Sequence, residues 1–250
     1  MKKAMLCIFG LLLMVAGGAL AEELPVITFA TDATWPPMEF VDANKNVTGF
    51  SIEYVTRAGR EAGFTPKFVA VAWDGIFAGL DVGKYDAIVS SVSITEKRKQ
   101  AMDFSEPYFQ VRQALIVPKD SPVTSLTELV GKEVGSQIST TGTFAIKEVP
   151  GVIAKTYDEV GLAVEDLHNG RIAGVVCDDP VAANYVLQNE KYAKTLKIAA
   201  VMQSKEAEFY GIAVKKGNKQ VLDLVNKGIA ALKAKGTDIK LRDKWIGGEK

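Results

Sequence analysis

The segment Ala87-Ile88-Val89-Ser90-Ser91-Val92-Ser93-Ile94-Thr95-Glu96-Lys97-Arg98 contains the pattern that decides the fold. Its apolar first part predicts a short buried β-strand over residues 87–91, and hydroxyl and charged side chains follow directly. Short apolar strands that end in polar side chains recur along the chain, with helical segments between them. This alternation is typical of an α/β fold.

Further strands are predicted on both sides of this segment. They cover residues 26–31, 68–72, 114–117, 133–136 and 172–177. A helix with Ser51 as its N-cap is predicted to end at Gly63, and a long helix is predicted over about residues 220–235. Together these elements predict an α/β fold with largely parallel sheets.

Residues 1–21 have the features of a cleavable signal peptide. Lys2 and Lys3 precede an apolar stretch, and Ala19-Leu20-Ala21 supplies the small-x-small pattern of a cleavage site. The alternative is a membrane anchor, but a spanning helix needs about 20 apolar residues and this stretch is shorter. We therefore expect cleavage after Ala21 and a soluble periplasmic protein.

The composition of the remaining 229 residues narrows the class of function. Loss of Lys2 and Lys3 leaves 28 basic against 30 acidic side chains, so nothing indicates nucleic acid as a partner. Cys177 is the one cysteine left and cannot form an internal disulfide. His168 is the single histidine, and we expect neither a metal site nor a cofactor.

The side chains that follow the predicted strands are candidates for a binding site, because ligands of open α/β sheets sit beyond the carboxyl ends of the strands. The candidates are Asp32, Trp35, Trp73, Ser90, Ser91, Ser93, Arg98, Thr140, Thr141 and Asp178. An amino-acid zwitterion needs a guanidinium and hydroxyl donors for its carboxylate, and a carboxylate for its ammonium group. The candidate set contains these groups.

Each candidate also has an ordinary structural interpretation. Arg98 lies in a charged stretch and would commonly be a solvated surface arginine. Asp178 or Asp179 could be the N-cap of a helix that begins at Pro180, and Asp179 is the better candidate for that role. Trp35 and Trp73 could belong to the core. Composition and spacing therefore do not identify a ligand.

Longer motifs carry a resemblance that covers nearly the whole chain after residue 30. They are Thr31-Asp32-Ala33-Thr34-Trp35-Pro36-Pro37-Met38-Glu39-Phe40, Gly49-Phe50-Ser51-Ile52-Glu53, Gly83-Lys84-Tyr85-Asp86-Ala87, Ser93-Ile94-Thr95-Glu96-Lys97-Arg98, Met102-Asp103-Phe104-Ser105-Glu106-Pro107-Tyr108, Asp178-Asp179-Pro180-Val181-Ala182 and Tyr210-Gly211-Ile212-Ala213. In these motifs the sequence resembles the amino-acid-binding family of periplasmic solute-binding proteins that serve ABC importers.

The resemblance implies the type II periplasmic binding protein fold. Two α/β lobes, each a mostly parallel sheet flanked by helices, would be joined by two hinge strands and would close over the ligand. The first lobe would comprise residues 24–111 and 209–250, and the second would comprise residues 112–208. The protein would act as a monomer, with a free L-amino acid and the membrane subunits of an ABC importer as partners.

The resemblance also implies a role for each site residue. Arg98 would bind the ligand carboxylate with Ser91, Ser93 and Thr141, and Asp178 would bind the α-ammonium group. The remaining contacts would be Trp35 and Trp73 along the ligand side chain, Asp32 at its far end, and Gln137 from the second lobe. Two departures concern the second lobe: Ser139 replaces the usual Gly, and Cys177 stands where Thr or His is common.

The ligand class follows from Asp32. A buried carboxylate without a cationic partner is costly, so Asp32 favours a basic amino acid such as lysine, arginine, ornithine or histidine. Glutamine or another polar amino acid is the alternative. An enzyme resembling cyclohexadienyl dehydratase is a further alternative on the same fold, and a sensor domain is disfavoured because no signalling segment follows. We expect a binding protein and not an enzyme.

Overall fold

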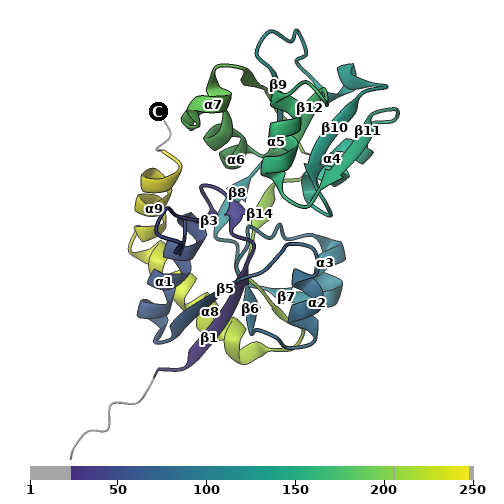
Figure 1. Cartoon of the computed structure of the whole chain (residues 1–250). Helices are drawn as coiled ribbons and strands as arrows, with labels where there is room; N and C mark the ends of the chain where they lie inside the picture. Colours follow the sequence, from purple (N-terminus) through teal and green to yellow (C-terminus); the bar gives the residue numbers. More distant parts are fainter. Residues whose placement is uncertain (1–23, 205, 248–250) are drawn as a thin grey trace, which may run out of the picture.

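The computed structural model describes residues 24–204 and 206–247, so the predicted signal peptide lies outside the described residues. Figure 1 shows two lobes, one above the other, which are connected near the middle of the molecule. Within the described ranges, no helix is long and apolar enough to cross a membrane.

The lower lobe in Figure 1, lobe 1, is built on one five-stranded sheet. Its strands, in spatial order, are β5 (Thr65–Ala70), β1 (Val26–Thr31), β6 (Ala87–Ile88), β15 (Ala213–Lys215) and β7 (Met102–Phe104). Four strands run in one direction and β15 runs against them. Successive β1 side chains point to opposite faces, so Phe29 and Ala30 belong to two separate core clusters.

Helices cover both faces of this sheet. They are α1 (Phe50–Ala62), α2 (Ile76–Asp81), α3 (Glu96–Ala101), α8 (Lys219–Ala234) and α9 (Thr237–Trp245), and a small sheet adds β2 (Thr34–Trp35), β3 (Glu39–Val41) and β4 (Val47–Thr48). The approach of α8 to α1 requires glycine, because a Cβ on Gly228 would lie 2.6 Å from the carbonyl oxygen of Ala58.

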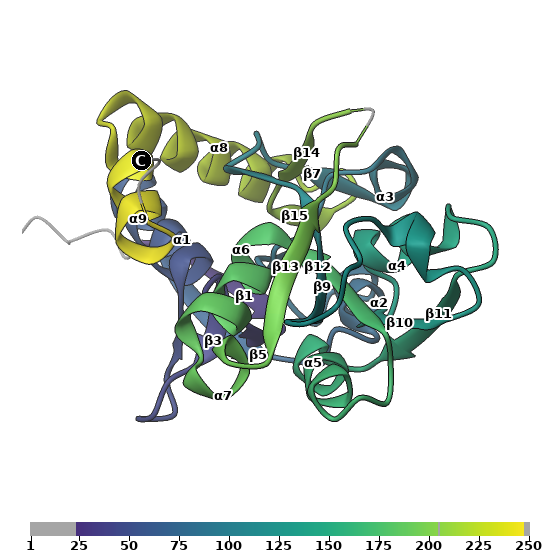
Figure 2. The same cartoon turned by 90° about the horizontal axis from the view of Figure 1, so that it is seen from above.

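The upper lobe, lobe 2, repeats this architecture. Its sheet has the order β11 (Ile153–Tyr157), β10 (Glu133–Gln137), β12 (Gly174–Asp178), β9 (Gln113–Pro118) and β13 (Leu196–Val201), and its helical segments are η1 (Leu126–Leu129), α4 (Thr141–Lys147), α5 (Val160–His168), α6 (Asp179–Ala183), η2 (Asn184–Gln188) and α7 (Glu190–Ala193). Again four strands share one direction, and β9 opposes them. Figure 2 shows α4 and α5 on opposite sides of β10. The prediction of two mostly parallel α/β lobes is confirmed.

Two antiparallel strands connect the lobes, as predicted. They are β8 (Phe109–Val111), which leads from β7 to β9, and β14 (Glu208–Tyr210), which leads from β13 to β15. The rings of Phe109 and Tyr210 stack across this connection with centroids 5.7 Å apart. The lobe boundaries predicted after residue 111 and before residue 209 fall within the connection, and their positions stay a prediction.

Two local predictions about helix caps are wrong. The N-cap of α1 is Gly49, at φ 127°, and the Ser51 hydroxyl instead contacts the Tyr108 hydroxyl at 3.1 Å. A Cβ on Gly49 would lie 2.3 Å from the Met38 carbonyl oxygen, so glycine is needed there. Asp179 is the first residue of α6 and not its cap: Asp178 holds the N-cap position, without a side-chain cap bond, and the Asp179 carboxylate accepts the Arg112 backbone N–H at 3.1 Å.

Candidate ligand-binding site

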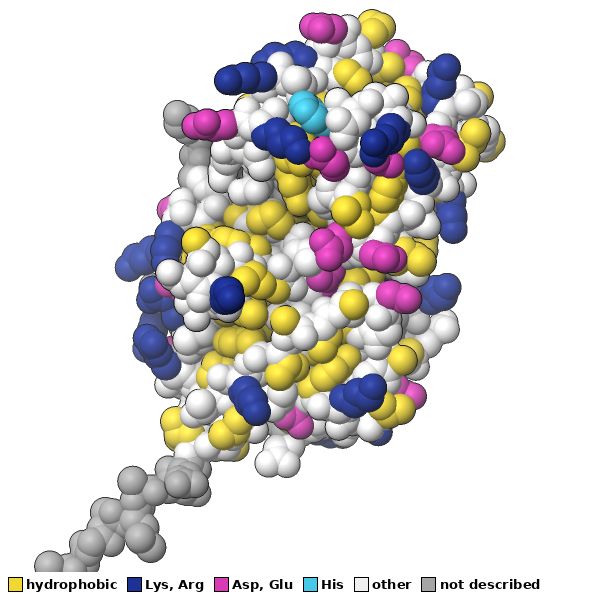
Figure 3. Space-filling model, in the orientation of Figure 1, with side chains coloured by type: hydrophobic (Ala, Val, Ile, Leu, Met, Phe, Trp, Pro, Cys, Tyr) yellow, Lys and Arg dark blue, Asp and Glu magenta, His cyan; other side chains and the backbone are white. Residues whose placement is uncertain are grey.

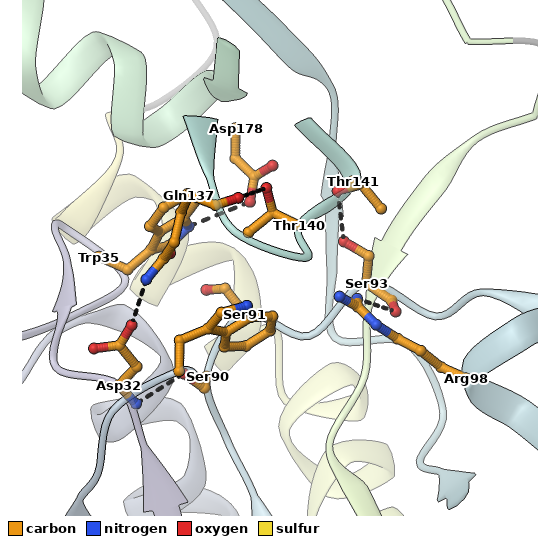
Figure 4. A pocket seen from close by; sticks show the side chains of 11 residues that line it. Asp32, Trp35, Ser90, Ser91, Ser93, Arg98, Gln137, Thr140, Thr141 and Asp178 are labelled. Atoms are coloured by element: carbon orange, nitrogen blue, oxygen red, sulfur yellow. Dashed lines mark hydrogen bonds between the residues drawn. The ribbon is translucent and has the colours of Figure 1, made fainter. Parts of the chain in front are cut away.

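A cavity lies between the two lobes. Its lining consists of Asp32, Trp35, Trp73, Ser90, Ser91, Ser93, Arg98, Gln137, Thr140, Thr141 and Asp178. All nine residues assigned to the site by resemblance are among them, together with Ser90 and Thr140 from the strand-end set. Figure 4 shows Asp32 and Arg98 on opposite sides of the cavity, with Asp178 at a third side.

Asp32 directly follows β1 and is 5% exposed. Its backbone N–H donates to Ser90 Oγ at 2.9 Å, and its carboxylate accepts Thr34 Oγ1 at 2.9 Å and Gln137 Nε2 at 2.8 Å. Burial raises the pKa of this carboxyl above its ordinary value, although both hydrogen bonds oppose the shift. Both donors to the carboxylate are neutral, and no cation pairs with it within the described ranges.

Arg98 projects from the first turn of α3, where Thr95 caps the helix by accepting the Arg98 N–H at 3.2 Å. Its guanidinium donates to the Ser93 carbonyl at 2.9 Å and the Ser139 carbonyl at 3.1 Å. It also lies over the rings of Trp73 and Phe77, 5.5 and 5.2 Å from their centroids. Loss of water around the guanidinium lowers the pKa of Arg98 to about 10. These contacts orient the guanidinium and leave other N–H groups for an anionic ligand.

Asp178 ends β12 and is 5% exposed. Its carboxylate accepts Trp35 Nε1 at 3.2 Å, Gln113 Nε2 at 2.6 Å and the Tyr210 hydroxyl. Burial first, and the nearby Glu208 carboxylate second, raise the pKa of Asp178 to about 7. A bound cation would stabilise the ionised form of this buried carboxyl group.

Polar contacts cross the cavity from one lobe to the other. Gln137 of lobe 2 bonds to Asp32, Trp35 of lobe 1 bonds to Asp178, and Trp73 Nε1 donates to the Ile138 carbonyl at 2.9 Å. Arg98 reaches the Ser139 carbonyl in the same way. The lobes therefore face each other closely enough for side chains from both to contact one small ligand.

One departure from the family pattern, Ser139 in place of Gly, falls where the backbone conformation favours glycine. Ser139 has φ 58°, in the left-handed region that glycine adopts without strain. We expect Ser139→Gly to raise the free energy of unfolding by up to about 1 kcal/mol, because relief of this strain exceeds the added entropy of the unfolded chain. Urea unfolding of the two proteins measures the difference. A stability loss above about 1 kcal/mol would contradict this account.

Three polar residues next to the cavity were not predicted from the sequence: Gln113, Glu208 and Tyr210. Gln113 and Tyr210 bond to Asp178, and Glu208 accepts Ser93 Oγ at 2.5 Å. Tyr210 belongs to a motif that was noted for its resemblance, but no local signal marks Gln113 or Glu208. Gln113 is 65 residues from Asp178 in the chain, and Glu208 is 115 residues from Ser93.

Two residues that carry reactive side chains lie outside this lining. His168 ends α5 in lobe 2, where Nδ1 and Thr195 Oγ1 are 2.8 Å apart. Cys177 is 1% exposed, and burial raises the pKa of its thiol, which makes the thiolate unfavourable. Among the described residues, no group of three or more His, Cys, Asp or Glu side chains could hold a metal ion.

Comparison with known proteins gives consistent matches over the full length of the fold. The model of "Bacterial extracellular solute-binding proteins, family 3" matches residues 27–248. A "Probable histidine-binding protein" of Neisseria gonorrhoeae is 33% identical over 239 residues, covering 94% of this chain and 88% of the relative. The "ABC transporter arginine-binding protein 1" of Escherichia coli is 32% identical over 251 residues, covering 98% and 99%.

A solved structure gives the same result. "An ancestral arginine-binding protein bound to arginine" superposes with a TM-score of 0.83 and 37% identity, covering 90% of this chain and all of that one. Sequence and structure comparisons therefore point to one family.

Proposed function

The chain belongs to family 3 of the bacterial extracellular solute-binding proteins, and from this premise we propose that it captures a basic amino acid in the periplasm and delivers it to an ABC importer. The relatives named above are arginine- and histidine-binding proteins, which supports a basic ligand. The signal peptide predicted over residues 1–21 supports the periplasmic location.

The observation that carries the proposal is the uncompensated acidity of the cavity. Asp32 and Asp178 line it, and Arg98 is the single basic residue in the lining. Glu39 is also 0% exposed, and burial raises its pKa well above the ordinary value, which disfavours a charge on this carboxyl. Figure 3 shows further acidic side chains on the surface at the junction of the lobes. A net positive ligand would balance these charges.

We assign the ends of the ligand to the three charged sides of the cavity. The α-carboxylate would bind Arg98 and Thr141, with Ser91 nearby, because a guanidinium and hydroxyls are the donors that a carboxylate requires. The α-ammonium group would bind Asp178. The side chain would pass Trp35 and Trp73, which favour an aliphatic or cationic group, and would end at Asp32 and Gln137.

A ligand panel tests the class of ligand. We expect L-arginine to bind at least tenfold more tightly than L-citrulline, its neutral analogue, because only the guanidinium forms a charge-assisted hydrogen bond with Asp32. L-Glutamate should bind more weakly still. Calorimetry measures each dissociation constant. Equal or tighter binding of citrulline or glutamate would refute the basic-ligand proposal, and tightest binding of L-glutamine would favour the polar alternative.

Asp32→Asn serves as the matched variant in this panel. It keeps the size of the side chain and removes the charge, so arginine binding should weaken while citrulline binding changes less than threefold. A uniform loss for both ligands would indicate damage to the cavity and not loss of a cation site.

The remaining alternative is an enzyme of the cyclohexadienyl dehydratase type. The relatives compared are named as binding proteins, and the cavity lining presents a complete set of partners for an amino-acid zwitterion. These observations support binding without catalysis. Incubation with prephenate or arogenate, followed by detection of an aromatic product, distinguishes the two, and product formation would contradict the proposal.

A further inference from the structure

Glu208 contacts the site from the strand that connects the lobes. It is the first residue of β14, and its Oε1 accepts a hydrogen bond from Ser93 Oγ at 2.5 Å. Ser93 is 2% exposed and lines the cavity, whereas Glu208 does not. A serine hydroxyl has one proton, and an ionised carboxylate can only accept. The proton of Ser93 is therefore directed at Glu208 and away from the cavity.

Gln113 is the second member of this arrangement. Its Nε2 lies 2.6 Å from Asp178 Oδ1, 3.1 Å from Glu208 Oε2 and 3.1 Å from Thr141 Oγ1. The Gln113 amide nitrogen thus has two protons for three acceptor oxygens, and one proton is donated to Asp178 in the shortest of these contacts. Because Thr141 Oγ1 accepts from this amide, its own hydroxyl proton is available to another acceptor.

The two residues come from the two segments that cross between the lobes. Gln113 begins β9 directly after the β8 crossing, and Glu208 begins the β14 crossing. Their contacts reach Ser93 in lobe 1 and Thr141 in lobe 2, whose hydroxyl oxygens lie 3.4 Å apart. The segments that connect the lobes therefore contact the two hydroxyl groups, of Ser93 and Thr141, that lie on the side of the cavity near Arg98.

We propose that Glu208 is a positioning residue that turns the Ser93 hydroxyl proton away from the ligand, so that Arg98 and Thr141, and not Ser93, donate to the α-carboxylate. The inference rests on the proposed function, since it takes an α-carboxylate as the group bound beside Arg98. It makes Ser93 a structural link between the crossing strand and the cavity wall.

Removal of Glu208 should release a donor for the ligand. We expect Glu208→Ala to tighten L-arginine binding by on the order of tenfold, because the freed Ser93 hydroxyl gains a hydrogen bond to a charged acceptor. At about pH 8, where protonation of Asp178 no longer limits binding, L-argininamide, which has no carboxylate, should gain much less than L-arginine. Glu206→Ala, a nearby exposed glutamate, is the matched control and should change neither value. Weaker arginine binding by Glu208→Ala, or an equal gain for both ligands, would overturn the inference.

Ser93→Ala tests the same point in two backgrounds. It should weaken arginine binding on the order of tenfold more in the Glu208→Ala background than in the native protein, because only in that background would the Ser93 hydroxyl donate to the ligand. Equal effects in both backgrounds would overturn the inference. Thermal unfolding confirms that each variant is folded.

A conservative variant separates proton positioning from simple charge repulsion. Glu208→Gln retains an oxygen that accepts the Ser93 proton, so its arginine binding should stay within threefold of native. If Glu208→Gln tightens binding as much as Glu208→Ala, charge repulsion is the cause and the inference fails. Native protein that binds argininamide as well as arginine would instead refute the carboxylate assignment to Arg98, which belongs to the proposed function.

Discussion

Arg98→Ala is expected to weaken amino-acid binding by 30-fold or more. Removing one partner of a buried charge-assisted pair typically costs about 2–5 kcal/mol, because the other charge loses its partner as well as its water. The variant also loses the contacts of the guanidinium with the carbonyls of Ser93 and Ser139, which lie in different lobes. Calorimetry with L-arginine measures the change in the dissociation constant.

Lys97→Ala is the matched control for this experiment. Lys97 is the exposed neighbour of Arg98 in α3 and does not line the cavity. Its removal should change binding less than twofold. Arg98→Lys retains the charge but not the planar fork, so it should fall between native and Arg98→Ala. An unchanged dissociation constant for Arg98→Ala would refute the role assigned to this residue.

The second large effect concerns Asp178 and pH. Burial is the main cause that raises the pKa of Asp178 to about 7, and an ammonium group bound there would favour the ionised form. Binding then releases a proton at pH values below about 7. Affinity should rise by up to about tenfold per pH unit between about pH 5 and 7, and it should level off above about pH 8.

The same raised pKa has the opposite consequence for folding. The folded state retains the Asp178 proton to higher pH than the unfolded chain, so ionisation of Asp178 opposes folding. This carboxyl therefore lowers the free energy of unfolding as the pH rises from about 4 to about 7. Ligand should stabilise the protein most strongly above that range.

Asp178→Asn tests the assignment because an amide resembles the protonated acid at every pH. At about pH 8 it should weaken arginine binding by 30-fold or more, and it should flatten the rise in affinity that native protein shows below pH 7. Asp32 can add a smaller dependence of the same sign, since its pKa is also raised. Asp179→Asn, next in sequence, should retain the native pH profile. A steep pH dependence that persists in Asp178→Asn would contradict the role of this carboxylate.

The local pattern of the sequence predicted the strands and helices well, because hydrophobic periodicity reports which side of an element is buried. It could not predict the order of the strands. β15 comes from residues 213–215, yet it lies between β6 and β7, more than 100 residues earlier in the chain. Pairing of this kind depends on packing between distant segments. The predicted helix caps at Ser51 and Asp179 were wrong for a similar reason, because both side chains form hydrogen bonds with residues distant in the chain.

The candidate site was predicted in two ways that differ in physical basis. The strand-end rule pointed to Asp32, Ser91 and Asp178, because carboxyl ends of parallel strands converge. Gln137 was predicted only from the family resemblance, and the resemblance alone distinguished Arg98 from an ordinary surface arginine. Glu208 was found by neither route, because its contact with Ser93 joins residues 115 positions apart.

The sequence by itself determined the α/β class, the chemical types of the site residues and the expectation of an exported amino-acid-binding protein. Only the tertiary structure decided the protonation and hydrogen bonding of those residues. It buried Asp178 beside Glu208, which raises the pKa of Asp178 to about 7, and it directed the Ser93 proton to the crossing strand. Secondary structure follows from local side-chain patterns, whereas a pKa and a proton position depend on which distant groups replace water around the atom.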